Sequence, residues 1–424
     1  RMQNDNLTWK GLRRTDPDRP RPLADAVLRL IWEERQISRA GIARRANLSR
    51  STVSEIVGEI LPMGLVSEVG EGPSRGGRRP ILIEFQDDAC VILGVEMSAT
   101  HVAVALTDLR GKVLTWVTEE HPVRTDPTGT RKLIEKLCLH CLSAPAAEGK
   151  PLVGIGIAVP SPVNPAHPDR LSTVVLPAWE ERLGLDGLSE RWGVPLFIDN
   201  DANLGALAEH WWGAGGDSDH LAYIKVATGI GSGHVIGGEI YRGATGVAGE
   251  IGHIAIDPLG KPCLCGLRGC LVTLVGGRAL EARAAELEND YPHSALAGKT
   301  FSIHDIESAG LAGDPLALQV IREAATHLGT AVAGLLNLMN PAVVVLGGGL
   351  SRLGEVMLEP LREMVQSSSL VSSVAAAKIL TSKLGPQSVA VGAATLVLKS
   401  ALDDSRFFPA VPGSTSPSSE EPAK

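Results

Sequence analysis

Four residues of the kinds that bind soft metal ions lie within 18 positions of one another, in the spacing His-x9-Cys-x-Cys-x4-Cys. They are His253, Cys263, Cys265 and Cys270. Three thiolates and one imidazole complete a tetrahedral set for a structural Zn²⁺ ion and leave no position open for a catalytic water. Reduced, uncoordinated cysteines in a surface loop are the alternative. The tight clustering favours zinc, and Gly266 and Gly269 would let the short loop turn around the ion.

Three further stretches carry groups that could bind or activate a small molecule. They are Phe197–Asn203, with Asn200 and Asp201; the glycine-rich Ala227–Gly233; and Gly249–His253, with Glu250. An acidic group at the end of an apolar strand could act as a general base on a hydroxyl, or it could simply cap a helix. The glycines could admit a phosphate to the backbone N–H groups, or form an ordinary turn. Singly, each motif is weak.

Residues 38–54 fit two short helices joined by a turn. Ser49 is a good N-cap for the second helix, in which Val53, Ile56 and Val57 recur at the spacing of a buried face. The polar residues of its first turns would then point outward. A helix of this kind can enter a major groove and contact base edges and phosphates. The predicted contacts are Arg50, Ser51, Thr52 and Ser54.

A β-hairpin is expected over Leu65–Phe85, and its glycine-rich loop carries Arg75, Arg78 and Arg79. Such a slim basic wing suits a minor groove or flanking phosphates. Residues 1–85 hold 15 Lys and Arg against 11 Asp and Glu, whereas the remainder holds 25 against 37. The alternative is that the helices and the hairpin only pack against the rest of the protein or against a partner chain. The charge and the polar helix together favour a double-stranded DNA operator, read by a homodimer or homotetramer with paired helices.

The hydrophobic pattern divides the chain into four parts. The Pro-rich, charged residues 1–22 and the Pro- and Ser-rich residues 403–424 are expected to be disordered. Helical spacing followed by the hairpin predicts a winged helix-turn-helix domain over 23–86. Alternating strands and helices predict an α/β domain over 90–402.

Inside the α/β domain, one unit is expected twice. Strands are predicted from Val91, over His101–Thr107 and over Val113–Val117. A similar strand-turn-strand pattern recurs from Leu221 to Tyr241. The echo predicts a body with two lobes.

Composition places the chain among ordinary globular proteins, with 424 residues, 44% hydrophobic and 21% charged. No window offers about 18 consecutive apolar residues, and the first 21 residues have no apolar core of a signal peptide. We therefore expect no membrane insertion and a cytoplasmic, nucleoid-associated protein.

The motifs together resemble the ROK family of repressors, open reading frames and sugar kinases, most specifically over Asp199–Leu271. The resemblance implies an actin-like, ribonuclease-H-like two-lobed fold with a sugar or sugar derivative between the lobes. The N-terminal extension resembles the xylose-repressor-type branch. It also implies that Asn200, Asp201, Glu250 and His253 bind the sugar, Asp201 matching the kinases' catalytic base, and that the Cys/His cluster matches the family's zinc ligands.

Three departures from the family kinases favour a regulator. Where the kinases have an Asp-x-Gly-Gly-Thr phosphate loop, this chain has Glu96–Thr100, with Ser98 and Ala99 in place of the glycines. The added Cβ atoms obstruct close approach of a nucleotide. Val272 replaces an expected sugar-binding glutamate, and Ser161 a glycine. The sequence thus predicts a sugar-responsive repressor whose base, Asp201, is vestigial; the alternative is an ATP-dependent sugar kinase that uses Asp201.

Overall fold

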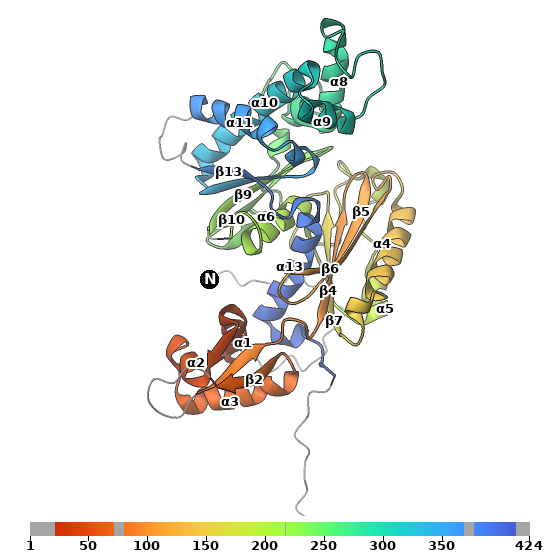
Figure 1. Cartoon of the computed structure of the whole chain (residues 1–424). Coiled ribbons are helices and arrows are strands. Elements are labelled where there is room, and N and C mark those ends of the chain that lie inside the picture. Colours follow the sequence, from red (N-terminus) through yellow and green to blue (C-terminus); the bar gives the residue numbers. More distant parts are fainter. Residues whose placement is uncertain (1–21, 72–79, 217, 369–376, 413–424) are drawn as a thin grey trace, which may run out of the picture.

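The computed structural model describes residues 22–71, 80–216, 218–368 and 377–412, arranged as three parts in a row (Figure 1). An N-terminal unit, comprising residues 22–71 and 80–85, lies at one end, followed by a first lobe and then a second lobe. The predicted wing residues Arg75, Arg78 and Arg79 lie outside the described residues. Within the described residues, no helix is both long and apolar enough to cross a membrane.

The N-terminal unit consists of three helices and a small antiparallel sheet. The helices are α1 (Pro22–Glu34), α2 (Arg39–Arg45) and α3 (Arg50–Ile60), and the strands are β1 (Gln36–Ser38), β2 (Val66–Glu71) and β3 (Ile81–Phe85), in the order β1-β3-β2. The three helices and the β2–β3 hairpin were expected from the sequence. Strand β1 was not, because three residues are too few to show any period.

The first lobe is built on a five-stranded sheet with buried faces. Its strands are β4 (Val91–Met97), β5 (His101–Thr107), β6 (Val113–Glu120), β7 (Leu152–Val159) and β8 (Leu196–Asn200). Helices α4 (Pro127–Leu142) and α5 (Asp186–Trp192) pack in one apolar cluster with the sheet, and α13 (Ser388–Asp403) packs in another. Gly94 and Gly156 permit a close approach of α13, since a Cβ at either would lie 1.9 Å from a carbonyl oxygen of that helix, of Ala390 and Ala393 respectively.

The second lobe repeats this plan. Its strands are β9 (His220–Val226), β10 (Ile230–Ile236), β11 (Glu239–Tyr241), β12 (Val343–Gly347) and β13 (Lys378–Thr381). The sheets run β6-β5-β4-β7-β8 and β11-β10-β9-β12-β13, which is the same order, with three antiparallel strands followed by two parallel ones. The sequence echo therefore marks a real repeat, and two such lobes define an actin-like α/β fold.

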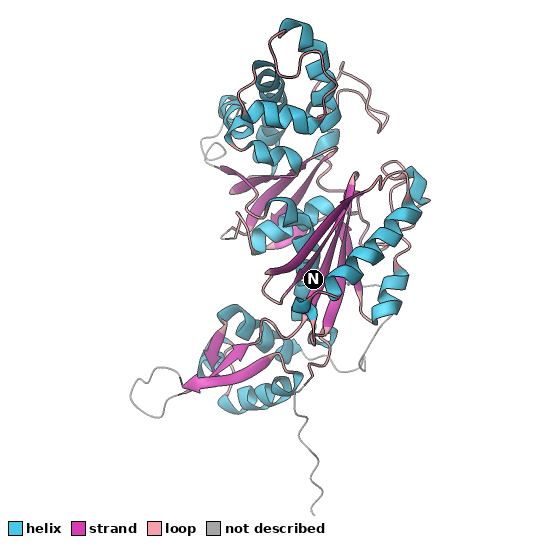
Figure 2. Cartoon of the chain, turned by 45° about the vertical axis from the view of Figure 1, so that its right-hand side comes forward, coloured by secondary structure: helices cyan, strands magenta, loops and turns pink. Residues whose placement is uncertain are grey.

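Helices cover both faces of the second sheet as well (Figure 2). The apolar cluster on one face contains α7 (Val272–Val275), α8 (Gly277–Leu287), α9 (Ile303–Leu311), α10 (Pro315–Met339) and α11 (Glu355–Ser368). Helix α6 (Asp201–Trp211) packs on the other face and against α13. It begins where β8 of the first lobe ends, so it joins the two lobes.

The N-terminal unit shares a hydrophobic core with the body. One continuous cluster contains Leu28 and Ile31 of α1 together with Leu204 of α6 and Leu402 of α13. The connection at residues 86–89 is therefore a boundary in sequence but not in packing. A helix whose apolar face has partners on both sides is held in a defined orientation.

The expected disorder from residue 403 onward is wrong for the first ten residues. Ser405 N donates to Asp25 Oδ1 at 3.1 Å, and the Phe407 ring lies 5.5 Å from that of Phe197 in an edge-to-face arrangement. Phe408 is buried. Two adjacent aromatic residues supply apolar area that the polar composition of the segment concealed.

Candidate functional site

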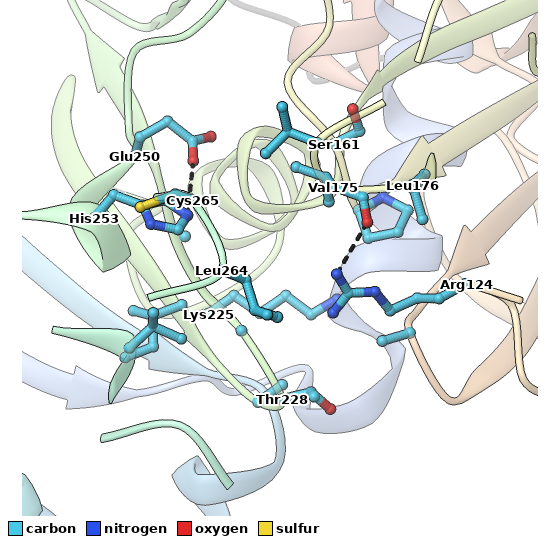
Figure 3. A pocket seen from close by; sticks show the side chains of 18 of the residues that line it. Arg124, Ser161, Val175, Leu176, Lys225, Thr228, Glu250, His253, Leu264 and Cys265 are labelled. Atoms are coloured by element: carbon cyan, nitrogen blue, oxygen red, sulfur yellow. Dashed lines mark hydrogen bonds and ion pairs between the residues drawn. The ribbon is translucent and has the colours of Figure 1, made fainter. Parts of the chain in front are cut away.

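A cavity of about 310 Å³ lies between the two lobes, at the carboxyl ends of strands β4, β7 and β8 (Figure 3). Such positions are where open α/β sheets bind ligands. The structure brings together here all four residues expected to bind a sugar. They are Asn200, Asp201, Glu250 and His253. The three positions that depart from the kinase pattern, at Ser98–Ala99, Ser161 and Val272, also line the cavity.

Asn200 and Asp201 stand at the start of α6. Asn200 is the N-cap: its Oδ1 accepts hydrogen bonds from the backbone N–H groups of Ala202 and Asn203 at 2.9 and 3.2 Å. Its Nδ2 donates to the carbonyl oxygen of Ser161 at 3.1 Å, which leaves one amide hydrogen for a ligand. The capping role and the proposed binding role therefore belong to the same side chain.

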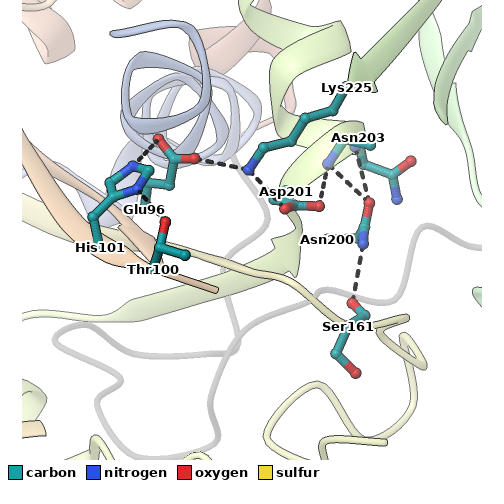
Figure 4. A network of polar contacts seen from close by, with 9 residues as sticks. Glu96, Thr100, His101, Ser161, Asn200, Asp201, Asn203 and Lys225 are labelled. Carbon is teal, nitrogen blue, oxygen red and sulfur yellow. Dashed lines mark hydrogen bonds and ion pairs between the residues drawn. The ribbon is translucent and has the colours of Figure 1, made fainter. Parts of the chain in front are cut away.

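Lys225 joins Asp201 to Glu96 across the lobes (Figure 4). Its Nζ lies 2.8 Å from Asp201 Oδ2 and 2.8 Å from Glu96 Oε1. Burial by itself lowers the pKa of Lys225, but the two carboxylates outweigh it and raise the pKa above its ordinary value. The ammonium of Lys225, which extends from β9 of the second lobe, is therefore held charged between Glu96 of β4 and Asp201 at the start of α6.

The carboxylate of Asp201 has little freedom left. Oδ2 accepts from Lys225, and Oδ1 accepts from Ala202 N at 2.8 Å. A carboxylate has about four acceptor positions, so it can still accept a hydrogen bond from a ligand hydroxyl. As a base it would have to take the proton on an oxygen that already accepts a hydrogen bond, either Oδ2 from the Lys225 ammonium or Oδ1 from Ala202 N.

Glu250 and His253 connect the cavity to the Cys/His cluster. His253 Nε2 lies 3.9 Å from Glu250 Oε2, while its Nδ1 faces Cys263 Sγ at 3.7 Å. Burial, with a smaller contribution from the charge of Asp201, raises the pKa of Glu250. Burial lowers the pKa of His253, which favours the neutral imidazole that a metal requires.

The Cys/His cluster has the separations that a tetrahedral metal site needs. The four ligand atoms all lie within 4.8 Å of one another. Cys265 Sγ and Cys270 Sγ are 3.7 Å apart, and two sulfurs each about 2.3 Å from a tetrahedral zinc would be separated by about 3.8 Å. Gly266 and Gly269 have φ angles of 90° and 66°, so both make the left-handed turns expected of them. A structural zinc ion would therefore be held by His253, Cys263, Cys265 and Cys270. Its role would be to hold the loop at Cys263–Cys270 in place.

The glycine run Ala227–Gly233 forms a loop only in part. Ala227, Thr228 and Gly229 turn and line the cavity, but β10 begins at Ile230. A Cβ on Gly233 would lie 2.2 Å from the carbonyl oxygen of Ala202. Gly233 therefore lets α6 pack against β10, whereas the turn at Ala227–Gly229 is the part of the run that could admit a phosphate to backbone N–H groups.

The polar surface of α3 matches the expectation for a DNA-contacting helix. Ser49 caps the helix by accepting from Thr52 N at 3.1 Å, and Asn47 takes the left-handed turn before it with φ 53°. Arg50, Ser51 and Ser54 are exposed and Thr52 is half-buried. The opposite face, with Val53, Ile56 and Val57, is buried.

Sequence reasoning missed Lys225 and Arg124. Lys225 stands in the apolar run Leu221–Val226, and a lysine in a buried strand almost always has a charged partner, which is the signal that could have found it. Arg124 Nη2 donates to the carbonyl oxygen of Val175 at 3.0 Å on the cavity wall. No local pattern marks it, because its loop is shaped by distant contacts.

Comparison with known proteins defines the class. Residues 92–400 match the model of the ROK family, and the chain belongs to that family. A putative xylose repressor of Caldicellulosiruptor sp. (strain Rt8B.4) is 34% identical over 89% of this chain and 95% of its own length. The DNA-binding transcriptional dual regulator NagC of Escherichia coli (strain K12) is 32% identical over 89% of this chain and 92% of its own.

Solved structures separate the regulators from the kinases. A ROK family transcriptional regulator, a homologue of the E. coli MLC protein, superposes with a TM-score of 0.77 at 28% identity over 91% of this chain and 97% of its own. A ROK family glucokinase from Streptomyces griseus, in complex with glucose and AMPPNP, reaches 0.62 at 30% identity over 72% and 98%. The regulators match the N-terminal unit as well as the lobes, and the chain is a transcriptional repressor of the family, not one of its kinases.

Proposed function

We propose that the N-terminal unit is a winged helix-turn-helix that binds a double-stranded DNA operator, and that a sugar or sugar derivative bound between the lobes changes its affinity for that operator. Helix α3 is the recognition helix. Its exposed Arg50, Ser51 and Ser54, with Thr52 beside them, contact bases and phosphates. Arg75, Arg78 and Arg79, which are outside the described residues, supply the wing. The protein works at the nucleoid as a homodimer or homotetramer.

The pairing of Lys225 with Asp201 and Glu96 is the observation that carries the sensing role. It keeps the Asp201 carboxylate in the cavity as a hydrogen-bond acceptor, with Oδ2 engaged by the ammonium and Oδ1 engaged by Ala202 N. Asn200, Glu250 and His253 provide further polar groups around the same space. Such a lining suits recognition of a polyhydroxylated ligand without phosphoryl transfer.

Calorimetry with purified protein tests the sensing role. D-xylose, D-glucose, N-acetylglucosamine and N-acetylglucosamine 6-phosphate are titrated into the parent protein and into Asp201→Ala. We expect at least one sugar to bind the parent and to bind Asp201→Ala at least tenfold more weakly, with no ADP released when ATP is added. Absence of binding by every sugar, or equal binding by the variant, would rule out this cavity as the sensor.

The second part of the experiment measures DNA binding, with a duplex that the parent protein has selected from a random library. Addition of the binding sugar should change the affinity for this duplex, and a tenfold change corresponds to about 1.4 kcal/mol of coupling. Arg322→Ala is the control variant, since Arg322 lies on α10 in the second lobe and pairs with an exposed Glu363. It should bind DNA and sugar as the parent does.

A further inference from the structure

One helix touches both the cavity and the N-terminal unit. Helix α6 begins at Asp201 in the cavity and ends at Trp211, with Trp212 as its C-cap. Its 11 residues span about 16 Å at 1.5 Å per residue. Helix α13 also contacts α1, but none of its residues lines the cavity.

The far end of α6 packs against an aromatic residue of α1. The ring of Trp32 lies 5.4 Å from that of Trp211 and 6.1 Å from that of Trp212, and the last two are 5.6 Å apart. We call these three residues the tryptophan cluster. Aromatic pairs at such distances prefer particular relative orientations, so they resist sliding past one another.

The tryptophan cluster is fixed to the first lobe by hydrogen bonds. Trp212 Nε1 donates to Thr395 Oγ1 at 2.8 Å, and Trp32 Nε1 donates to the carbonyl oxygen of Leu109 at 2.9 Å. The guanidinium of Arg110 lies 4.4 Å from the centre of the Trp32 ring, and its Nη1 donates to the Trp32 carbonyl oxygen. The orientation of α1 is therefore set by the end of α6 together with the loop at Leu109–Arg110 and α13.

Helix α6 is packed tightly enough to move as one body. Every residue from Ala202 to Glu209 is buried. A Cβ on Gly392 of α13 would lie 1.8 Å from the carbonyl oxygen of Leu204, so the two helices cross in backbone contact. The interior of such an element is close-packed, and a displacement at one end is carried to the other.

A shift of α1 would reach the DNA-contacting helix. Leu28 and Ile31 of α1 share a buried cluster with Val53 and Val57 of α3. We propose that Trp211 and Trp212 are positioning residues through which ligand binding at the start of α6 sets the orientation of the DNA-binding unit. This inference rests on the proposed sensing role and adds the physical connection to it.

A double-mutant cycle on DNA affinity tests the connection without any sugar. Asn200→Ala removes the cap at the cavity end of α6, and Trp211→Leu removes an aromatic contact at the other end. Their effects on affinity for the selected duplex should be non-additive by about fivefold, because the tryptophan cluster carries the ring contacts between the end of α6 and α1. Substitutions this far apart are ordinarily additive. An additive result overturns the proposal.

Matched variants separate positioning from folding. Trp192→Leu removes another half-buried tryptophan, on α5 of the first lobe, and should be additive with Asn200→Ala. Trp211→Phe keeps an aromatic ring, so Asn200→Ala should have the same effect on DNA affinity in that background as in the parent. If Trp211→Leu is poorly folded by its thermal transition, Trp32→Leu replaces it in the cycle, with the same expectation and the same refuting result.

D-xylose and the other sugars of the calorimetric panel provide the second arm. Trp211→Leu should bind the active sugar within about twofold of the parent, yet the sugar should no longer change its affinity for DNA. A sugar effect retained in full by Trp211→Leu refutes the connection and leaves the sensor intact. If no sugar acts on the parent, the sensing role fails, and the cycle alone decides whether α6 couples the two ends.

Discussion

Lys225 Nζ lies 2.8 Å from Asp201 Oδ2 and places an ammonium ion beside the residue that, by its motif, resembles the base of the family kinases. The same nitrogen lies 2.8 Å from Glu96 Oε1, in the segment that resembles the phosphate loop of those kinases. One side chain thus engages both acidic positions of the kinase pattern. The cavity therefore retains both acidic groups and holds them on one ammonium ion.

Lys225→Met should destabilise the protein strongly. It leaves Glu96 and Asp201 without their buried partner, and breaking a buried ion pair in this way costs about 3 to 5 kcal/mol. Lys136→Met is the control, because Lys136 pairs with Glu119 at an exposed position and should cost no more than about 1 kcal/mol. Urea denaturation at pH 7 measures both, and equal stability of the two variants would contradict a structural role for the buried pair.

Arg50→Ala should weaken operator binding and relax base preference, by about 1 to 3 kcal/mol if Arg50 makes a bidentate contact with guanine. Arg78→Ala and Arg79→Ala should weaken binding to all sequences alike and flatten its salt dependence, as lost phosphate contacts do. Fluorescence anisotropy with selected and scrambled duplexes, at several salt concentrations, distinguishes the two patterns. A triple variant with unchanged affinity would remove the assignment of DNA binding to these elements.

Purified protein should contain about one zinc ion per chain. The His253, Cys263, Cys265 and Cys270 side chains fill all four positions of a tetrahedral site. Cys265→Ser should lose the metal and weaken sugar binding, because His253 borders the cavity and its imidazole faces Glu250. Cys141→Ala, which removes a buried cysteine outside the cluster, should retain the zinc. Elemental analysis of the parent that finds no zinc would refute the site.

The six cysteines should separate into two groups by their reactivity. Burial raises the pKa of Cys90 to about 12 and that of Cys141 to about 11, so at pH 8 these thiols are almost entirely protonated and unreactive. Cys138 is buried in the same way. A thiol reagent at pH 8 should modify Cys263 and Cys265 after a chelator is added, since Cys270 is buried as well, and all six cysteines after denaturation. Modification of Cys90 in the native protein at the rate of Cys265 would contradict this picture.

The sequence by itself determined the features whose residues are neighbours in the chain. The metal cluster spans 18 positions. Helix α3 is predicted by its N-cap, Ser49, and by the spacing of Val53, Ile56 and Val57. Each depends on local geometry, since a cap acts within three residues and a helical face repeats every three or four. The repeated strand pattern could also be recognised in the sequence, because side chains alternate between the two faces of a strand with a period of two residues.

Only the tertiary structure decided which distant residues meet. Lys225 and Glu96 are 129 positions apart, and Trp32 reaches Trp211 from another part of the fold. Neither pairing has a period or a spacing, because contacts across lobes depend on how whole sheets and helices pack. The described part of the tail, residues 403–412, was misjudged for the same reason. Its composition is polar, but Phe407 and Phe408 find an apolar surface that exists only once α1, α13 and β8 have come together.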